Sequence, residues 1–406
     1  MTTIQLREWT TRHGLDLSLA QRDLLRKRFD VRLQPTPARE GRFDVTPKER
    51  IGAAMIGDTA VVIQPKIAMN RLLFLLEYTA DPAGWRDDHG QYDTAPDLMT
   101  AMAGLFARLA TQATSRGLLA GYRQVDDYLH TVRGRIDLAN QLRRRPGLDL
   151  PIAVTYQHHD EDIPENRLLA AAVRMLRPLP IGDPVARRSL SRLADALRDV
   201  ASIHSSHNAR IVWTRHNSHY RAAVEVARLL LEHSSIDVAA GTTAAPAIVL
   251  DMNDVFEQFV RSALRHVLGV SDSEFPDGDG TDLRLDVQSA VVLKPDLSLW
   301  QDGRCVFVGD VKYKRDAATG HNPDLYQLLA YATGTALPEA TLVYADGPHA
   351  PAVHHIPGPG ITLHRRRLDL TLPPSALLQQ IGILADHLRA HSRRASADHR
   401  HLTVAA

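Results

Sequence analysis

The chain of 406 residues is 44% apolar, which is ordinary for a globular protein, and it is long enough for two or three domains. No apolar run is long enough to span a bilayer and the N-terminus does not resemble a signal peptide, so we expect a cytoplasmic protein with no membrane partner. Its net charge of +1 confines any nucleic-acid-binding surface to part of the molecule, and its single cysteine, Cys305, excludes an internal disulfide framework and a cysteine-rich zinc site.

The first part of the chain, residues 1–130, is predicted to be a mixed α/β domain. Two apolar runs on either side of Gly57-Asp58 predict a β-hairpin. Residues 72–78 are apolar on nearly all sides, which predicts a buried helix. Apolar residues at helical spacing predict a further helix over residues 97–113.

The middle part, residues 131–244, is predicted to be a helical domain. Amphipathic helices are expected over residues 166–176, 189–203 and 220–231. A segment of small residues over 239–246, rich in glycine and threonine, indicates a linker to the last domain.

From residue 245 the pattern changes, and we expect an α/β domain over residues 245–392. The predicted elements, in the order α-β-β-β-α-β, are a helix over 251–268, strands over 283–288, 290–300 and 305–313, a helix over 324–333 and a strand over 340–344. A helix over 374–391 and a disordered tail over 393–406 follow. The expected fold class is therefore a multidomain α+β or α/β architecture.

One predicted hairpin of the last domain carries three charged groups. Asp296 begins its first strand, and the turn Gln301-Asp-Gly-Arg304 leads into the second. Asp310 and Lys312 lie two residues apart on that second strand and so point to the same face. Their neighbours are apolar, and burying charges is costly unless they bind something. Half of the six lysines fall between residues 294 and 314, which indicates that an ammonium rather than a guanidinium is needed there.

This constellation suits the hydrolysis of a phosphodiester. Two carboxylates fit an oxygen-seeking divalent cation, Mg²⁺ or alternatively Mn²⁺, which can polarise a phosphate and lower the pKa of an attacking water. The Lys312 ammonium can hold that water or stabilise charge that builds on the phosphate. The alternative is an ordinary ion pair between Asp310 and Lys312, with Asp296 as a turn cap. The position of Pro-Asp at the start of one strand and Asp-x-Lys at the end of its partner favours the metal site.

Two flanking helices add candidate residues. Glu257, on the helix over 251–268, could supply a third carboxylate, or it could be a solvated helix residue. Gln327 and Tyr331 lie four residues apart on the next helix and share one face. They could contact a metal-bound water or a DNA phosphate, or they could serve only in packing and capping.

This arrangement resembles the PD-(D/E)xK nuclease superfamily, with Glu257, Asp296, Asp310, Lys312 and Gln327 at the matching places. The wider chain, from about residue 50 to 350, resembles the McrC family, the nuclease subunits of McrBC modification-dependent restriction systems. The stretches that carry this second resemblance are Gln64-Pro-Lys-Ile to Leu72-Leu-Phe-Leu-Leu-Glu-Tyr, Val132-Arg-Gly-Arg-Ile-Asp-Leu, Asp162-Ile-Pro-Glu-Asn-Arg-Leu-Leu and Leu250-Asp-Met-Asn-Asp-Val-Phe-Glu.

The resemblance implies an Mg²⁺-dependent endonuclease that cuts double-stranded, methylated DNA. Asp296, Asp310 and Glu257 would be its metal ligands, and Lys312 and Gln327 would complete the catalytic set. It also implies a partner, a McrB-like AAA+ GTPase hexamer, which the domain over residues 1–130 would enter and stimulate. The chain contains no Gly-Lys-Ser/Thr phosphate loop, which agrees with a motor on a separate subunit.

Two other functions stay open on the sequence alone. A stand-alone PD-(D/E)xK repair or recombination nuclease would cut DNA without any GTPase. A non-catalytic assembly subunit would activate the GTPase and tolerate Lys312→Ala. Elsewhere, Asn166 and Arg167 are expected to lock the helical domain internally, and the loop around Asp277 is expected to be solvated rather than to bind calcium.

Overall fold

The computed structural model of the chain describes residues 2–37, 40–56, 59–86, 97–144, 150–201, 203, 211–237, 245–313, 322–345 and 352–404. The chain forms two compact units, one made of Met1–Ala101 with Ile236–Ala406 and the other of Met102–Ser235. The two units have other boundaries than the domains predicted to end at residues 130 and 244. Those predicted domains stay a prediction. Among the described residues, no helix combines the length and the apolar character needed to cross a bilayer.

The first unit contains a five-stranded sheet in the order β1-β6-β5-β11-β10. Its strands are β1 (Thr2–Arg7), β5 (Arg50–Ile56), β6 (Thr59–Gln64), β10 (Ser234–Asp237) and β11 (Ala245–Asp251). β5 and β6 pair antiparallel, which confirms the two strands of the first predicted hairpin; their turn, Gly57-Asp58, lies outside the described residues. A Cβ on Gly52 would lie 1.9 Å from the carbonyl oxygen of Ile248, so only glycine permits this approach of β5 and β11.

A smaller sheet near the N-terminus has the order β2-β4-β3. It consists of β2 (Arg12–Asp16), β3 (Arg32–Pro35) and β4 (Arg42–Thr46), and the helix α1 (Leu19–Phe29) precedes β3. A capping box between Ser18 and Gln21 starts α1, because each side chain accepts a hydrogen bond from the other residue's backbone N–H.

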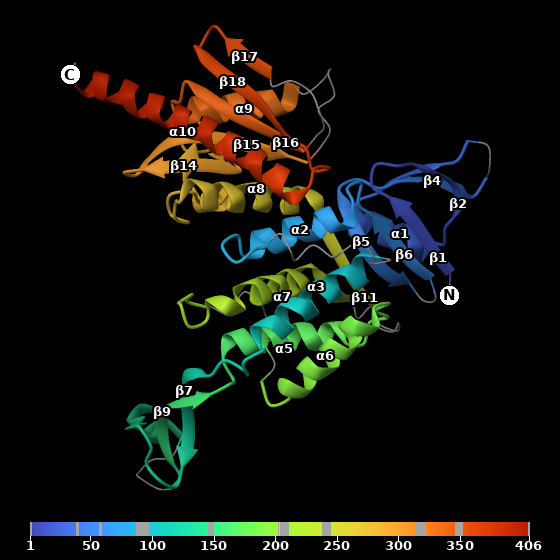
Figure 1. Cartoon of the computed structure of the whole chain (residues 1–406), viewed down its shortest axis with the longest axis vertical. Helices are drawn as coiled ribbons and strands as arrows, with labels where there is room; N and C mark the ends of the chain where they lie inside the picture. The colour runs from blue at the N-terminus through green and yellow to red at the C-terminus, as the bar shows by residue number, and fades with distance from the viewer. Residues whose placement is uncertain are drawn as a thin grey trace. The chain divides into compact units, whose positions relative to one another are not determined.

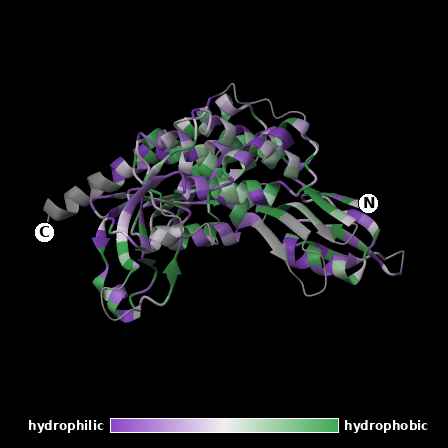
Figure 2. Cartoon of the chain, turned by 90° about the horizontal axis from the view of Figure 1, so that it is seen from below, coloured by the Kyte–Doolittle hydropathy of each residue, from purple (hydrophilic) through white to green (hydrophobic). Residues whose placement is uncertain are grey.

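Two helices, α2 (Met69–Ala80) and α8 (Met252–Leu268), pack against each other in the first unit (Figure 1). The rings of Phe74 and Tyr78 on α2 lie 5.6 and 5.7 Å from the ring of Phe259 on α8, in edge-on arrangements. The predicted buried helix over 72–78 is thus confirmed. Apolar and polar residues are interleaved along the helices, as expected where one face is buried (Figure 2).

The C-terminal part of the first unit is built on a five-stranded sheet in the order β14-β15-β16-β18-β17. Its strands are β14 (Leu297–Gln301), β15 (Arg304–Lys312), β16 (Glu339–Ala345), β17 (Ala352–Ile356) and β18 (Ile361–Leu368), and the short pair β12 (Leu283–Arg284) and β13 (Val292–Leu293) precedes it. β15, β16 and β18 run parallel, while β14 and β17 are antiparallel edge strands. Asp302 and Gly303 both have positive φ, at 49° and 75°, which makes a tight turn between β14 and β15.

Helices cover this sheet on its two faces. α9 (Asn322–Gly334) connects β15 to β16 and packs on β15, β16 and β18, over a core that includes Val308, Leu342 and Leu363. α8 and α10 (Pro374–Val404) pack on each other and on β15, with α10 also on β18 (Figure 1). Side chains alternate along a strand, so the neighbours of the α9-facing residues point toward α8 and α10.

The second unit combines helices with a three-stranded sheet in the order β7-β9-β8. Its elements are most of α3 (Leu98–Ala113), β7 (Gly121–Leu129), β8 (Arg135–Ile136), α4 (Leu138–Arg144), β9 (Ile152–Asp160), α5 (Pro164–Leu176), α6 (Pro184–Ala196) and α7 (Arg221–His233). On α5, Asn166 donates to the carbonyls of Leu119 and Glu161, and Arg167 forms two 2.7 Å hydrogen bonds with Asp162. The predicted internal locking by Asn166 and Arg167 is confirmed.

Three predictions of the fold need correction. The middle region over 131–244 is not purely helical, because β9 pairs with β7, a strand that precedes the predicted boundary after residue 130. The helix expected over 189–203 is α6, which begins five residues earlier because Asp183 caps it and Pro184 occupies its first turn. The helix α10 continues to Val404, so the backbone of residues 393–404 is helical where disorder was expected.

Candidate active site

The strand β15 carries the two charged groups that the sequence places on one face. Val308 belongs to the core under α9, so Asp310 and Lys312, at alternating positions, point to that same face. Lys312 Nζ lies 2.6 Å from Asp310 Oδ2. Asp310 is only 1% exposed, although it is a carboxylate. The apolar sequence of β15 therefore buries one member of this ion pair almost completely.

Asp296 joins the pair from the residue just before β14. Its Oδ2 accepts a 2.8 Å hydrogen bond from the backbone N–H of Val311 and lies 3.9 Å from Lys312 Nζ. The antiparallel pairing of β14 with β15 fixes this meeting, because Leu297 is opposite Gly309 in the register. The structure thus brings together Asp296, Asp310 and Lys312, as the sequence predicts.

The electrostatics of Asp310 show a carboxylate short of partners. Burial, and then the neighbouring Asp296 carboxylate, raise the pKa of Asp310 well above its ordinary value in spite of Lys312. Burial alone would lower the pKa of Lys312, but the two carboxylates outweigh it and raise that pKa. Asp310 Oδ1 accepts no hydrogen bond from any described residue. A buried oxygen in this state is costly, so the arrangement fits a site completed by a bound cation.

Glu257 projects from α8 into an open cleft of about 310 Å³ that Asp296 also lines. Burial and then the charge of Asp296 raise the pKa of Glu257 to about 7. Arg261, one turn further along α8, forms an ion pair with Glu257 and lies near the carbonyl of Asp296. Asp251 starts this helix by accepting a hydrogen bond from the N–H of Asn253, which sets where Glu257 falls.

Of the predicted site residues, Gln327 is linked to the others least directly. Its Nε2 donates to the Tyr331 hydroxyl at 2.9 Å, and that hydroxyl donates to the carbonyl of Lys294, also at 2.9 Å. The predicted shared face of Gln327 and Tyr331 on α9 is therefore confirmed. Through Tyr331, Gln327 reaches the segment between β13 and β14 that contains Asp296. Among the described contacts, none joins it directly to a carboxylate of the site.

The donor set fits a hard divalent cation. Asp296 and Asp310 offer carboxylate oxygens close to Lys312, and Glu257 offers a third carboxylate from the same cleft as Asp296. Oxygen donors of this kind are those that Mg²⁺ and Mn²⁺ prefer. The unpartnered Oδ1 of Asp310 is the observation of this structure that most directly agrees with such an ion.

The cleft contains residues that the sequence did not single out for this site. Arg261, Asp254 and Asp277 line it together with Glu257. The loop around Asp277 was expected only to be solvated, whereas it contributes to the wall of the cleft. Arg261 and Asp254 could have been predicted as neighbours of Glu257, because they lie four and three residues from it on one helix.

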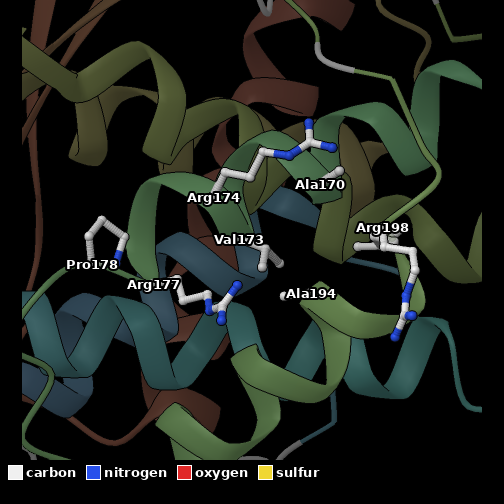
Figure 3. Close-up of a pocket in the computed structure, with 8 residues that line it drawn as sticks. Ala170, Val173, Arg174, Arg177, Pro178, Ala194 and Arg198 are labelled. Carbon is white, nitrogen blue, oxygen red and sulfur yellow. The ribbon is translucent and has the colours of Figure 1, made fainter.

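A second cavity, of about 600 Å³, lies in the second unit between α5 and α6. Figure 3 shows the guanidinium groups of Arg174, Arg177 and Arg198 around an apolar floor. No carboxylate lines this cavity, so its described walls offer nothing to hold a divalent cation. Of these two cavities, the cleft beside Asp296 is the one lined by carboxylates.

Comparison with known proteins agrees with the McrC resemblance. The family described as McrBC 5-methylcytosine restriction system component matches residues 45–345. No curated protein matches the chain. Among solved structures, the chain is similar to one described as a refined half-complex from a tetradecameric assembly of Thermococcus gammatolerans McrB AAA+ hexamers with bound McrC. The identity is 18% and the TM-score 0.56, over 95% of this chain and 100% of that one.

A second structure, the cryo-EM structure of the Thermococcus gammatolerans McrBC complex, is 23% identical with a TM-score of 0.42, over 66% of this chain and 89% of that one. The first similarity shows a shared fold, and the second, with its lower TM-score, is too weak to support a conclusion.

Proposed function

Because the chain belongs to the McrBC 5-methylcytosine restriction system component family, we propose that it is the McrC-like nuclease subunit of such a system. In this proposal it is an Mg²⁺-dependent endonuclease that cuts double-stranded, methylated DNA. Its C-terminal sheet, with α8, α9 and α10, is then a PD-(D/E)xK nuclease domain. The order of α8, the β14–β15 hairpin, α9 and β16 supports that assignment.

One observation carries the proposal: Asp296, Asp310 and Lys312 converge, and Asp310 has a buried oxygen that accepts no hydrogen bond from the described residues. A structural ion pair needs only one carboxylate, and a second one beside it raises the pKa of Asp310. A site for a cation needs that second carboxylate.

Each residue then has a task in hydrolysis. Asp296 and Asp310, with Glu257, would hold the cation; when bound, the cation supplies a Lewis acid that polarises the phosphate and lowers the pKa of a water. Lys312 lies within 4 Å of both aspartates and can donate to the attacking water or to a phosphate oxygen. Gln327 donates to the Tyr331 hydroxyl, and that hydroxyl donates to the Lys294 carbonyl, which holds the backbone two residues before Asp296.

The partner in this proposal is a McrB-like AAA+ GTPase hexamer. The structural neighbour contains McrB AAA+ hexamers with bound McrC, and it covers 95% of this chain. The first unit's N-terminal sheets, which contain none of the candidate catalytic residues, are the part that we assign to docking and to stimulation of GTP hydrolysis.

The test is cleavage of methylated and unmethylated plasmid DNA in Mg²⁺, with and without the neighbouring AAA+ protein and GTP. We expect cleavage only of methylated DNA and only with both. Asp310→Asn and Lys312→Arg should each lower the cleavage rate by about 10²-fold or more, because the first removes a metal-binding charge and the second cannot place a compact ammonium 2.6 Å from Asp310.

Asp302→Asn is the matched control, since it makes the same substitution in the exposed turn of the same hairpin. It should cut at the wild-type rate. Cleavage by this chain alone would favour a stand-alone repair or recombination nuclease. Stimulation of the GTPase with no cutting under any condition would favour a non-catalytic assembly subunit.

A further inference from the structure

Three histidine side chains gather between the sheet and the C-terminal helix, away from the candidate active site. His364 is on β18, and His387 and His391 are one turn apart on α10. One ring nitrogen from each lies within 4.8 Å of the other two. The ring centroids are 4.0 to 4.9 Å apart.

The fold explains this meeting. α10 packs on β15 and β18 (Figure 1). Residues four apart on a helix share a face, and the rings of His387 and His391 both lie beside the ring of His364 on β18. Leu363 faces the core under α9, so His364 points to the other face, toward α10. Asp310 shares the α9 face with Val308, so the histidines and the candidate active site lie on opposite faces of the sheet.

A carboxylate completes the group. Glu339 begins β16, and its Oε2 lies 3.2 Å from His364 Nε2 and 2.7 Å from His391 Nε2. His391 is only 4% exposed, and neither of its ring nitrogens makes a hydrogen bond with a described residue. His364 Nδ1 is equally without a partner there. Buried nitrogens in this state are costly unless something else binds them.

We propose that His364, His387, His391 and Glu339 form a structural zinc site. Three imidazole nitrogens and one carboxylate oxygen are donors that Zn²⁺ accepts in tetrahedral geometry, at bond lengths of roughly 2.0–2.2 Å. Donor atoms around such an ion lie about 3.4 Å apart by that geometry, close to the separations between Glu339 and the two histidines. The site is largely buried, as expected for a closed structural site rather than a catalytic one. It fastens α10 to the starts of β16 and β18.

Two arginines border the site. Arg394 Nη2 lies 2.9 Å from Glu339 Oε2, where it can balance the carboxylate's charge. Arg366 Nη2 lies 3.0 Å from His387 Nδ1, and since a guanidinium only donates, that nitrogen accepts. His387 Nε2 lies 3.3 Å from Thr341 Oγ1, so zinc binding by His387 requires one of these two hydrogen bonds to break. Arg366→Met should raise the affinity for zinc, because it removes a positive charge beside the site.

The experiment measures zinc on the full chain after removal of metals with a chelator, re-equilibration with Zn²⁺ and gel filtration in Mg²⁺ buffer. We expect one zinc ion per wild-type chain and a loss of it in His391→Ala and His364→Ala. His355→Ala, an exposed histidine on the adjacent strand β17, is the matched control and should keep the zinc. Asp310→Asn should also keep it, which separates this site from the candidate active site.

Co²⁺ replaces zinc in a second measurement that does not depend on the folding of any variant. The wild-type chain loaded with Co²⁺ should show the intense visible absorption of a tetrahedral centre. Absence of that absorption, absence of retained zinc in the wild type, or equal zinc in the wild type and in correctly folded His391→Ala would each overturn the proposal.

Discussion

Asp310 is the residue at which stability and the proposed activity conflict most clearly. It is buried, its Oδ1 is unpartnered, and its pKa is raised well above the ordinary value, first by burial and then by Asp296. An acid whose pKa is higher in the folded state destabilises that state increasingly as pH rises above its unfolded value. The cost is therefore present at neutral pH in the absence of a metal.

Asp310→Asn should accordingly raise the free energy of unfolding in a chelator at neutral pH, although we expect it to lower the cleavage rate. The gain should shrink as pH is lowered toward the ordinary pKa of an aspartate. Denaturant unfolding at several pH values measures it, with Asp302→Asn as the reference. A variant less stable than the wild type at neutral pH would show that the Lys312 ion pair outweighs the burial.

Glu8 is a second buried acid, far in the sequence from the candidate catalytic residues. It is 2% exposed, accepts hydrogen bonds from the N–H of Lys66 and the hydroxyl of Tyr313, and has its pKa raised to about 7, chiefly by burial. A rise from 4.5 to about 7 corresponds to roughly 3 kcal/mol between the two protonation states. This stability is present below the unfolded pKa and is lost as pH rises toward 7.

Glu8→Gln should therefore remove part of the fall in stability between pH 4.5 and 7, because the amide keeps a buried acceptor without a charge. Thermal unfolding at half-unit pH steps gives the curve. The wild type and the variant should differ most at the alkaline end of the range. Parallel curves would mean that Glu8 does not titrate in this interval.

At the scale of an element, Gly309 governs how β15 lies beside β16. A Cβ at this position would lie 2.6 Å from the carbonyl oxygen of Thr341 and 3.2 Å from the ring of Phe307. The first of these atoms is backbone of the adjacent strand, so the strands themselves would have to separate. Asp310 is the next residue, and the separation would move it.

Gly309→Ala should destabilise the chain by about 1–3 kcal/mol and lower cleavage in parallel. Gly382→Ala is the control, since a Cβ there meets nothing within 4 Å and α10 would gain helix propensity. Urea unfolding of both variants measures the difference. Equal stability of the two would contradict the assignment of a close strand contact at Gly309.

At the scale of the whole molecule, each of the two units has its own core. In the second unit, Arg167 holds Asp162 with two 2.7 Å hydrogen bonds, and Asp162 also accepts from the N–H of Ala201. The pKa of Asp162 is lowered to about 2, first by Arg167. Arg167 thus ties the start of α5 to the segment that follows α6.

Arg167→Ala should increase amide hydrogen exchange within residues 102–235 and leave exchange in the C-terminal sheet unchanged. Arg198→Ala is the comparison, because Arg198 pairs only with an exposed Asp195 at 3.6 Å, and such a surface pair contributes little. Hydrogen exchange followed by mass spectrometry measures both. Faster exchange in β15 of Arg167→Ala would refute the separation of the two cores.

Periodicity in the sequence was sufficient to predict the long elements and to place the charged residues of one hairpin on a common face. α2, α8, α9 and β15 follow from apolar spacing and from local caps, because each is decided by residues that are neighbours in the sequence. The two-residue spacing of Asp310 and Lys312 fixes their common face for the same reason.

The tertiary structure decided what depends on partners that are distant in the sequence. The pairing of β9 with β7, and of β17 with β18, was not predicted, since these strands carry many polar residues and show no clear local pattern. Neither the burial of Asp310 nor the meeting of His364 with His387 and His391 can be read from spacing, because packing of separate elements creates both. By itself the sequence determined which residues can carry the chemistry; the packing of sheet and helices decided which of them meet, because only burial removes water from charged groups and leaves them to one another.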